Sequence, residues 1–219
     1  MYRPPANRVD DLSVAARIVR DHGFGHLVVS GPDGLDAVPV PVIVDVPDDG
    51  GGLARAGLLR VRAHVARANP IWRAAPCPAM LIVSPDDAYI SPSFYPSKRR
   101  DPKVVPTWNY ELVHLHGTVQ ARPDPAWLET LVRELTVRNE ATMAEPWAVD
   151  DAPADFIERM LRAIVGIELE VTLVEAKRKL SQNRTAEDVA GVVAGLAGGV
   201  DRAAAVARAM ADVTGTDAT

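Results

Sequence analysis

The stretch Val104–Gln120, with the sequence VVPTWNYELVHLHGTVQ, is the most informative part of this chain. From Leu112 onward apolar and polar residues alternate, which is the pattern of a half-buried β-strand. The stretch also holds a tryptophan, a tyrosine and two histidines, although aromatic residues make up only 5% of the chain. Such side chains need hydrogen-bond partners when they are buried. The segment is therefore either a cofactor-pocket wall or a Trp/Tyr corner of an ordinary core, and by itself it favours neither.

The composition indicates a globular protein of one or two domains. The chain has 219 residues, of which 47% are hydrophobic and 24% charged, enough to bury a core. The net charge of −5 and the pI near 5.5 argue against a direct nucleic-acid partner. One cysteine, Cys77, permits neither an internal disulfide nor a thiolate metal site. Without a long apolar run or a signal peptide, we expect a cytoplasmic protein with no membrane partner.

Periodicity predicts an α+β fold, a small barrel with peripheral helices. The predicted helices begin at Asp10–Asp11, span residues 125–139 and 155–163, and resume after Arg184 in an Ala/Gly-rich tail expected to be weakly ordered. The predicted strands are short, alternating and linked by turns, at residues 27–30, 37–46, 58–65, 80–84, 88–90, 112–120 and 167–174. Residues 48–52 form a predicted loop. Strands of this kind favour antiparallel pairing around one core.

His64 lies where a predicted strand passes into a short helix. Asn69 and Pro70 are a helix-start signal, with asparagine as the cap and proline at the first position. A histidine beside Arg67 and a helix start suits an anion or metal-cofactor site. A lone histidine is more often structural, and the two interpretations carry about equal weight here.

Two further segments carry polar groups suited to ligand binding. The loop Tyr89–Lys98 combines hydroxyl groups, prolines and a basic end, so it is either a formed anion-binding loop or a solvated connection. Lys179–Arg184, KLSQNR, is either a helix cap with surface charge or part of the same site. The basic clusters at residues 98–100 and 177–179 are explained by a small anionic ligand at least as well as by nucleic acid.

Taken in order, five motifs resemble those of the PaiB family, often labelled FMN-binding negative transcriptional regulators. They are Met1-Tyr2-x-Pro, His64-x-Ala-Arg67-Ala-Asn69-Pro70-x-Trp72, Tyr89-Ile90-Ser91-Pro92-Ser93-x-Tyr95, Val105-Pro106-Thr107-Trp108-Asn109-Tyr110-x-x-Val113-His114-x-x-Gly117 and Lys179-Leu180-Ser181-Gln182-Asn183-Arg184. The resemblance implies an FMN-binding-type split β-barrel and a homodimer with cofactor at the interface. It covers residues 1–184, expected to be the cofactor-binding domain, and leaves 185–219 as a C-terminal helical extension.

One departure from the family shifts the expected cofactor. Where the family usually shows Ala-Thr-His-Leu-Pro, this chain reads Ala37-Val38-Pro39-Val40-Pro41, so two polar groups that could face a flavin are apolar. The same family includes haem-dependent piperazate synthases, which close N5-hydroxyornithine into a ring through an N–N bond in natural-product biosynthesis. An apolar wall and a rim histidine suit haem. The resemblance therefore implies haem b slightly ahead of FMN.

The leading expectation is thus a haem-dependent cyclase that makes piperazate from a small amino-acid substrate. His64 is the expected iron ligand. The other expected cofactor-binding residues are Arg67, Asn69, Lys98, Trp108 and Arg184, and the expected catalytic residues are Tyr95, Lys103, Thr107, Tyr110 and His114.

Two other functions stay open at this stage. The first is an FMN-binding oxidoreductase or transcriptional regulator, in which Lys98 and Arg67 hold the phosphate and Trp108 packs near the ring. The second is a non-catalytic dimer that controls transcription through a partner. The acidic charge and the lack of a recognisable helix-turn-helix argue against direct DNA binding.

Overall fold

The computed structural model describes residues 1–32, 34–46, 59–199 and 201–215. Its contacts divide the chain into two compact units. Unit 1 comprises Met1–Asp10, Ser84–Val113 and Glu175–Thr219, and unit 2 comprises Asp11–Val83 and His114–Val174. The long strands β8 (Thr107–Arg122) and β9 (Ile164–Lys179) contribute residues to both units. The expected domain boundary between residues 184 and 185 stays a prediction.

Unit 2 contains the split barrel. The sheet runs in the order β3-β2-β6-β8-β9-β5-β4. The shorter strands are β2 (Phe24–Gly31), β3 (Gly34–Pro41), β4 (Ile43–Asp45), β5 (Arg60–Ala66) and β6 (Cys77–Val83). The pairs β2–β3, β2–β6, β4–β5 and β5–β9 are antiparallel. Alternate side chains point inward and form an apolar core, whose buried members include Leu27, Val40, Val61, Ala63, Leu81, Val119 and Ile167.

Among the residues that the structure describes, unit 2 has three α-helices. Helix α1 (Leu12–His22) starts as predicted, because the Asp11 carboxylate accepts a hydrogen bond of 2.8 Å from the Ser13 amide. It ends at Gly23, which has a φ of +69°. The other two are α2 (Pro125–Glu140) and α3 (Ala154–Arg162), and the 3₁₀ segments η3 (Pro70–Ala74) and η6 (Val149–Asp151) complete the unit.

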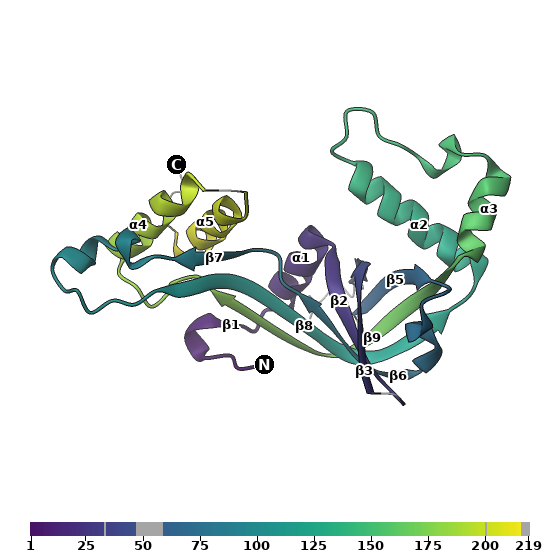
Figure 1. Ribbon diagram of the computed structural model, residues 1–219, viewed down its shortest axis with the longest axis horizontal. Helices are drawn as coiled ribbons and strands as arrows, with labels where there is room; N and C mark the ends of the chain where they lie inside the picture. Colours follow the sequence, from purple (N-terminus) through teal and green to yellow (C-terminus); the bar gives the residue numbers. More distant parts are fainter. Residues whose placement is uncertain (33, 47–58, 200, 216–219) are drawn as a thin grey trace. The chain divides into compact units, whose positions relative to one another are not determined.

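Unit 1 carries the remaining part of the same sheet, and helices cover one face of it. Parts of β8 and β9 pair with β7 (Asp87–Ile90) and β1 (Arg8–Val9) respectively. Helices α4 (Ala186–Ala197) and α5 (Asp201–Thr214) lie over this sheet (Figure 1). Short 3₁₀ segments occur at η1 (Pro5–Asn7), η4 (Pro92–Phe94) and η5 (Pro96–Arg99). The buried core between helices and sheet includes Ile90, Tyr95, Leu180, Val192, Leu196 and Met210.

The structure corrects two predictions about local order. The predicted strand at residues 37–46 is two strands, β3 and β4, and between them the Val42 amide donates to the Gly23 carbonyl at 2.9 Å. The Ala/Gly-rich tail forms α4 as a regular helix. Its Gly195 is needed for packing, since a Cβ there would lie 2.4 Å from the Phe94 ring. Close tertiary packing thus offsets the weak helix propensity of glycine.

Strands β8 and β9 are each 16 residues long, well beyond their predicted lengths. The predicted loop at residues 48–52 and the first residue of the predicted strand 58–65 lie outside the described residues. Within the part of the chain that the structure describes, no helix combines the length and the apolar character needed to cross a membrane.

Candidate cofactor site

The sheet of unit 1 has one face covered by helices and one open face. Asn109 of β8 donates to Met210 of α5, and Arg178 of β9 donates to Asp212 of α5, so these side chains point toward the helices. Side chains alternate along a strand. The neighbouring positions Trp108 and Tyr110 on β8 and Lys177 and Lys179 on β9 therefore point the other way. Together with Tyr89 of β7, the register partner of Trp108, they define what we call the open face.

Lys177 is a buried cation on the open face. Its relative exposure is 7%, and its ammonium donates to the Tyr110 hydroxyl at 2.9 Å. The same ammonium lies 5.2 Å from the centroid of the Tyr110 ring and 5.6 Å from that of Tyr2. Among the described residues, no carboxylate forms an ion pair with it. Cation–π contacts offset part of the desolvation, but an unpaired buried charge is unfavourable.

Lys179 lies two residues after Lys177 on β9, on the same open face. Its ammonium donates to the Thr107 hydroxyl and to the Trp108 carbonyl. Burial lowers the pKa of Lys179 below its usual range, and the charge of Lys177 lowers it further, against an opposing effect of Tyr110. The open face thus holds two cations whose partners here are hydroxyl, carbonyl and ring groups.

Trp108 and Tyr89 form an aromatic pair beside these lysines. They are register partners on β8 and β7, their ring centroids are 5.9 Å apart and their planes meet at 69°. Trp108 is 52% exposed and Tyr89 is 49% exposed. Large aromatic side chains left exposed next to polar groups are typical of ligand-binding or interaction surfaces.

The loop residues of the expected site occupy different environments. Tyr95 is buried in the core of unit 1, its hydroxyl has no hydrogen-bond partner among the described residues, and the Arg184 guanidinium stacks 4.4 Å from its ring centroid. Lys98 and Lys103 are exposed. The loop before Lys98 is anchored where the Ser97 hydroxyl donates to the buried Asp188 at 2.7 Å. Tyr95 therefore belongs to the core with the half-buried Arg184 against its ring, whereas the two lysines face solvent.

His64 lies in unit 2 on the outer face of the barrel wall. Its neighbour Ala63 points into the core, so the imidazole points outward. Its partner on β9 is Gly166, and a Cβ there would lie 2.3 Å from the Trp127 ring, so α2 covers this position. The half-buried ring leaves Nδ1 buried without a hydrogen-bond partner among the described residues. Burial also lowers the pKa of His64, which favours the neutral imidazole.

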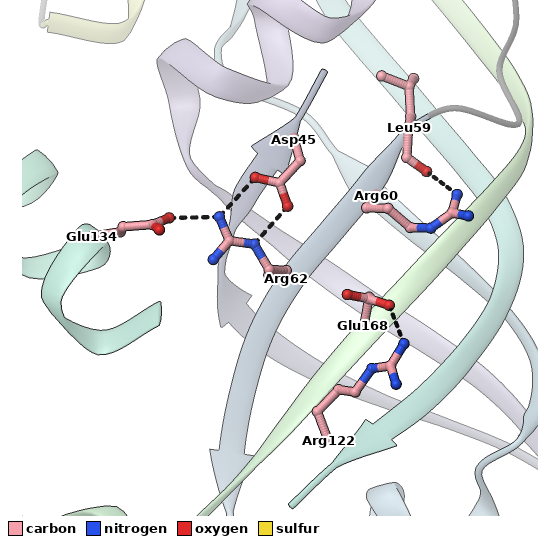
Figure 2. Close-up of polar contacts among 7 residues, drawn as sticks. All are labelled: Asp45, Leu59, Arg60, Arg62, Arg122, Glu134 and Glu168. Carbon is pink, nitrogen blue, oxygen red and sulfur yellow. Dashed lines mark hydrogen bonds and ion pairs between the residues drawn. The ribbon is translucent and has the colours of Figure 1, made fainter. Parts of the chain in front are cut away.

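The rest of the outer face near His64 is an ion-pair network, drawn in Figure 2. Arg62 bonds Asp45 through two contacts of 2.6 and 2.7 Å and Glu134 of α2 at 2.5 Å. Arg122 bonds Glu168 at 2.6 Å. These carboxylates raise the pKa of Arg62 above its usual range. Each arginine has an internal counterion, so the Arg62 group joins β4, β5 and α2, and the Arg122 pair joins β8 and β9.

The remaining expected site residues in unit 2 have structural contacts. Arg67 donates to the carbonyls of Arg162 at 2.7 Å and Ile164 at 2.9 Å. Asn69 caps η3 as predicted, because its side chain accepts from the Ile71 amide at 3.0 Å. His114 lies on the polar face of β8, where its ring is edge-on to that of His116 at 5.9 Å.

Sequence reasoning singled out part of the open face and missed the rest. Trp108, Tyr110 and Thr107 were expected site residues. Lys177 and Lys179 appeared in the sequence analysis as part of a basic cluster, without individual roles. Lys177 and Lys179 are two residues apart within a strand, so both lie on one face and Arg178 lies on the other. This spacing is the sequence signal that could have distinguished them. The contacts of Tyr2 and Tyr89 had no local sequence signal.

A family profile described as "Putative FMN-binding domain" matches residues 1–173. This chain belongs to that family. A relative within the PaiB-like group is the protease synthase and sporulation protein PAI 2 of Bacillus subtilis, which is 29% identical over 198 residues covering 88% of this chain and 87% of the relative. The resemblance to PaiB proteins is therefore confirmed.

Solved structures of similar fold agree with the split barrel. A conserved hypothetical protein of Mycobacterium tuberculosis superposes with a TM-score of 0.55 at 13% identity, over 84% of this chain and 92% of the other. A protein of Mycobacterium smegmatis described as binding FAD and haem superposes with a TM-score of 0.51 at 15% identity, over 88% and 80%. At such identities the likeness concerns the fold alone, and it confirms the predicted α+β split barrel.

Proposed function

We propose that this protein binds FMN, as a PaiB-like flavoprotein. The observation that supports the proposal is the open face of unit 1, where the exposed Trp108–Tyr89 pair adjoins two lysines that have no carboxylate partner among the described residues. FMN is a planar ring joined to a phosphate, and such a ligand needs an aromatic surface and a cationic surface side by side. Bound FMN would supply redox chemistry.

The residues present fit this ligand. The Trp108 side chain would pack against the flavin ring, as expected from the sequence. The Tyr89 ring, which is edge-on to the indole, would keep Trp108 in its orientation. The Thr107 hydroxyl and the Lys179 ammonium, which contact each other, would face the polar part of the ligand. Of the two residues first expected to hold the phosphate, Lys98 is exposed and remains available, whereas Arg67 already donates to two backbone carbonyls.

The test is equilibrium binding of FMN to the purified protein, followed by quenching of flavin fluorescence. We expect saturable binding, and we expect Trp108→Ala to weaken it about tenfold or more, in line with the energy of aromatic stacking. Trp147→Ala is the matched control, because Trp147 is exposed to a similar degree, 45%, but lies in unit 2. Absence of FMN binding by the unmodified protein would refute the proposal.

A second candidate function is the haem-dependent formation of piperazate. One observation favours it: His64 offers an uncharged imidazole with a buried, unpartnered Nδ1 among the described residues, the state that metal ligation requires. Haem would supply iron as a Lewis acid. Of the expected substrate-orienting residues, Thr107 and Tyr110 lie near the open face, Lys103 is exposed and His114 is half-buried, while Tyr95 is buried in the core.

The two candidates are separated by adding haem to the purified protein and recording its absorption. Under the haem proposal, a Soret band appears and is altered or lost in His64→Ala, but is kept in His26→Ala, which changes an exposed histidine of the same unit. Tight FMN binding without a His64-dependent Soret band would eliminate the haem candidate.

A homodimer with cofactor at the interface is part of both proposals, and so is a cytoplasmic location. The expected residues come from two units, with His64, Arg67 and Asn69 in unit 2 and Trp108 and Tyr110 in unit 1. The interface site is proposed from the resemblance to the PaiB family, which implies a homodimer. Light scattering coupled to size-exclusion chromatography gives the mass, and a monomeric holoprotein would contradict the interface site.

A further inference from the structure

We infer that Lys177 and Lys179 form the binding site for a phosphate monoester, the anionic end of the ligand that occupies the open face. The inference rests on the proposed FMN binding and names which residues receive the phosphate. It differs from the sequence-based expectation, in which Lys98 and Arg67 held that group.

The first support is the unusual state of Lys177. Its side chain is almost completely buried, yet its hydrogen-bond partner is the neutral Tyr110 hydroxyl at 2.9 Å. Buried charges in proteins are normally paired, because desolvation of a lone ammonium is unfavourable. A bound anion would provide the counterion that the described residues do not.

The nearest carboxylate along the same strand already has cationic partners. Glu175 lies two positions before Lys177, and its two carboxylate oxygens accept from the Met1 ammonium at 2.9 and 2.8 Å. Arg3 lies 3.6 Å from the same carboxylate. Glu175 therefore neutralises the N-terminal cations, and the positive charge of the two lysines remains uncompensated within the described residues.

The second support is the set of donors around the two ammonium groups. Lys177 and Lys179 lie on one face of β9, and the ring of Tyr110 lies between them, 5.2 Å from one ammonium and 5.9 Å from the other. The hydroxyls of Tyr110 and Thr107 each contact one ammonium. Two cations and two hydroxyls on one surface match the several acceptor oxygens of a phosphate monoester.

The third support is access. Tyr2, whose ring covers the Lys177 ammonium, is itself 81% exposed, and Trp108 beside Lys179 is 52% exposed. The neighbouring cation Arg178 is different, because its charge is already paired. Arg178, between the two lysines in sequence, bonds both Glu111 and Asp212. The Lys179 ammonium therefore lies beside an exposed aromatic group, whereas the Lys177 ammonium lies beneath the exposed Tyr2 ring.

The experiment compares FMN, riboflavin and inorganic phosphate as ligands of the unmodified full-length protein. Riboflavin has the ring but lacks the phosphate. We expect FMN to bind roughly tenfold to a hundredfold more tightly than riboflavin, the range that one or two charge-assisted hydrogen bonds provide. We expect Lys179→Gln and Lys177→Met to remove most of that preference and leave riboflavin binding nearly unchanged.

Arg208→Gln is the matched control, since Arg208 is an exposed cation of the same unit with no place in the expected site, and its loss should leave the preference intact. Lys179→Gln, at the less buried position, keeps the test valid if Lys177→Met folds poorly, and circular dichroism checks the fold of both. Equal binding of FMN and riboflavin by the unmodified protein would overturn this inference while leaving flavin binding intact.

A different pattern would separate the inference from the proposed function. A second outcome is that no flavin binds, but inorganic phosphate raises the melting temperature of the unmodified protein and not that of Lys179→Gln. This result would support the phosphate site and refute the proposed FMN binding. If neither flavin nor phosphate binds, the phosphate site is overturned as well. A preference for FMN that survives both lysine substitutions and disappears in Lys98→Gln would assign the phosphate to the loop instead.

Discussion

The basic residues of the two units are used in opposite ways. On the barrel wall of unit 2, Arg62 and Arg122 each bond carboxylates of neighbouring elements. On the open face of unit 1, Lys177 and Lys179 have hydroxyl, carbonyl and aromatic partners instead. Arginine suits the first role because its planar group bonds several acceptors at once. The arginines of unit 2 are paired within the fold, whereas the two lysines have no carboxylate partner among the described residues, and the proposed binding site rests on this difference.

The largest effect should come from breaking the barrel that carries the paired arginines. A Cβ at Gly117 would lie 1.9 Å from the Glu170 carbonyl oxygen, which belongs to the backbone and cannot move aside. We expect Gly117→Ala to lower the free energy of unfolding by about 3 kcal/mol, as for a strongly overpacked core. Urea denaturation measures this change. Gly198→Ala is the control, because a Cβ there meets open space, and an equal loss in both variants would contradict the prediction.

The next test removes a paired cation. Arg62 is 13% exposed and its partners Asp45 and Glu134 are 41% and 42% exposed, so solvent screens part of the network. We expect Arg62→Met to destabilise the protein by about 2 kcal/mol, since two carboxylates lose their counterion. Arg159→Met, which breaks an exposed pair with Asp155, should cost about 0.5 kcal/mol or less by the same denaturation assay. Similar losses for both would mean that the network has no special structural role.

The unpaired cation should respond in the opposite direction. Lys177 is buried without a carboxylate partner among the described residues, so Lys177→Met removes a desolvated charge and keeps the side-chain volume. In the absence of ligand we expect the stability to stay the same or to rise by up to about 1 kcal/mol. Chemical denaturation in phosphate-free buffer is the measurement. A clear loss of stability would indicate that Lys177 serves the fold and not a ligand.

The smallest expected effect is on the pH dependence of the free energy of unfolding. Burial lowers the pKa of His64 in the folded state, so the unfolded chain binds a proton more readily. The ligand-free protein should therefore lose stability as the pH falls through and below about 6.5, the ordinary histidine value. His64→Gln should flatten that part of the stability curve measured between about pH 7 and 5. His26→Gln is the control and should leave the stability curve unchanged. A steep decline in stability that persists in His64→Gln would assign the pH dependence to other groups.

Local patterns predicted much of the fold because local physics governs those features. Asp11 and Gly23 bound α1 as expected, and Asn69 caps η3. The alternation around β8 gave the correct buried set, with Val113, Leu115 and Val119 inside. The length of β8 and β9 was underestimated, because pairing with different neighbours along each strand extends it past the alternating segment.

The site was harder to predict than the fold. Sequence motifs brought out Trp108, Tyr110 and His64, but gave no means of telling which charges were already neutralised. Arg67, an expected cofactor-binding residue, bonds two backbone carbonyls, while Lys177, expected only as one member of a basic cluster, is buried. Such distinctions depend on contacts across nearly the whole length of the chain, such as that between Glu175 and the Met1 ammonium.

By itself the sequence determined the helix ends, the strand faces and the family, because caps, alternation and ordered motifs are local properties of the chain. Tertiary structure alone decided which cations have counterions and which aromatic rings stay exposed. Those properties arise when distant strands are brought into register, and Tyr89 meets Trp108 and Tyr110 meets Lys177 through that register. Electrostatic pairing depends on distance in space, which a linear pattern does not contain.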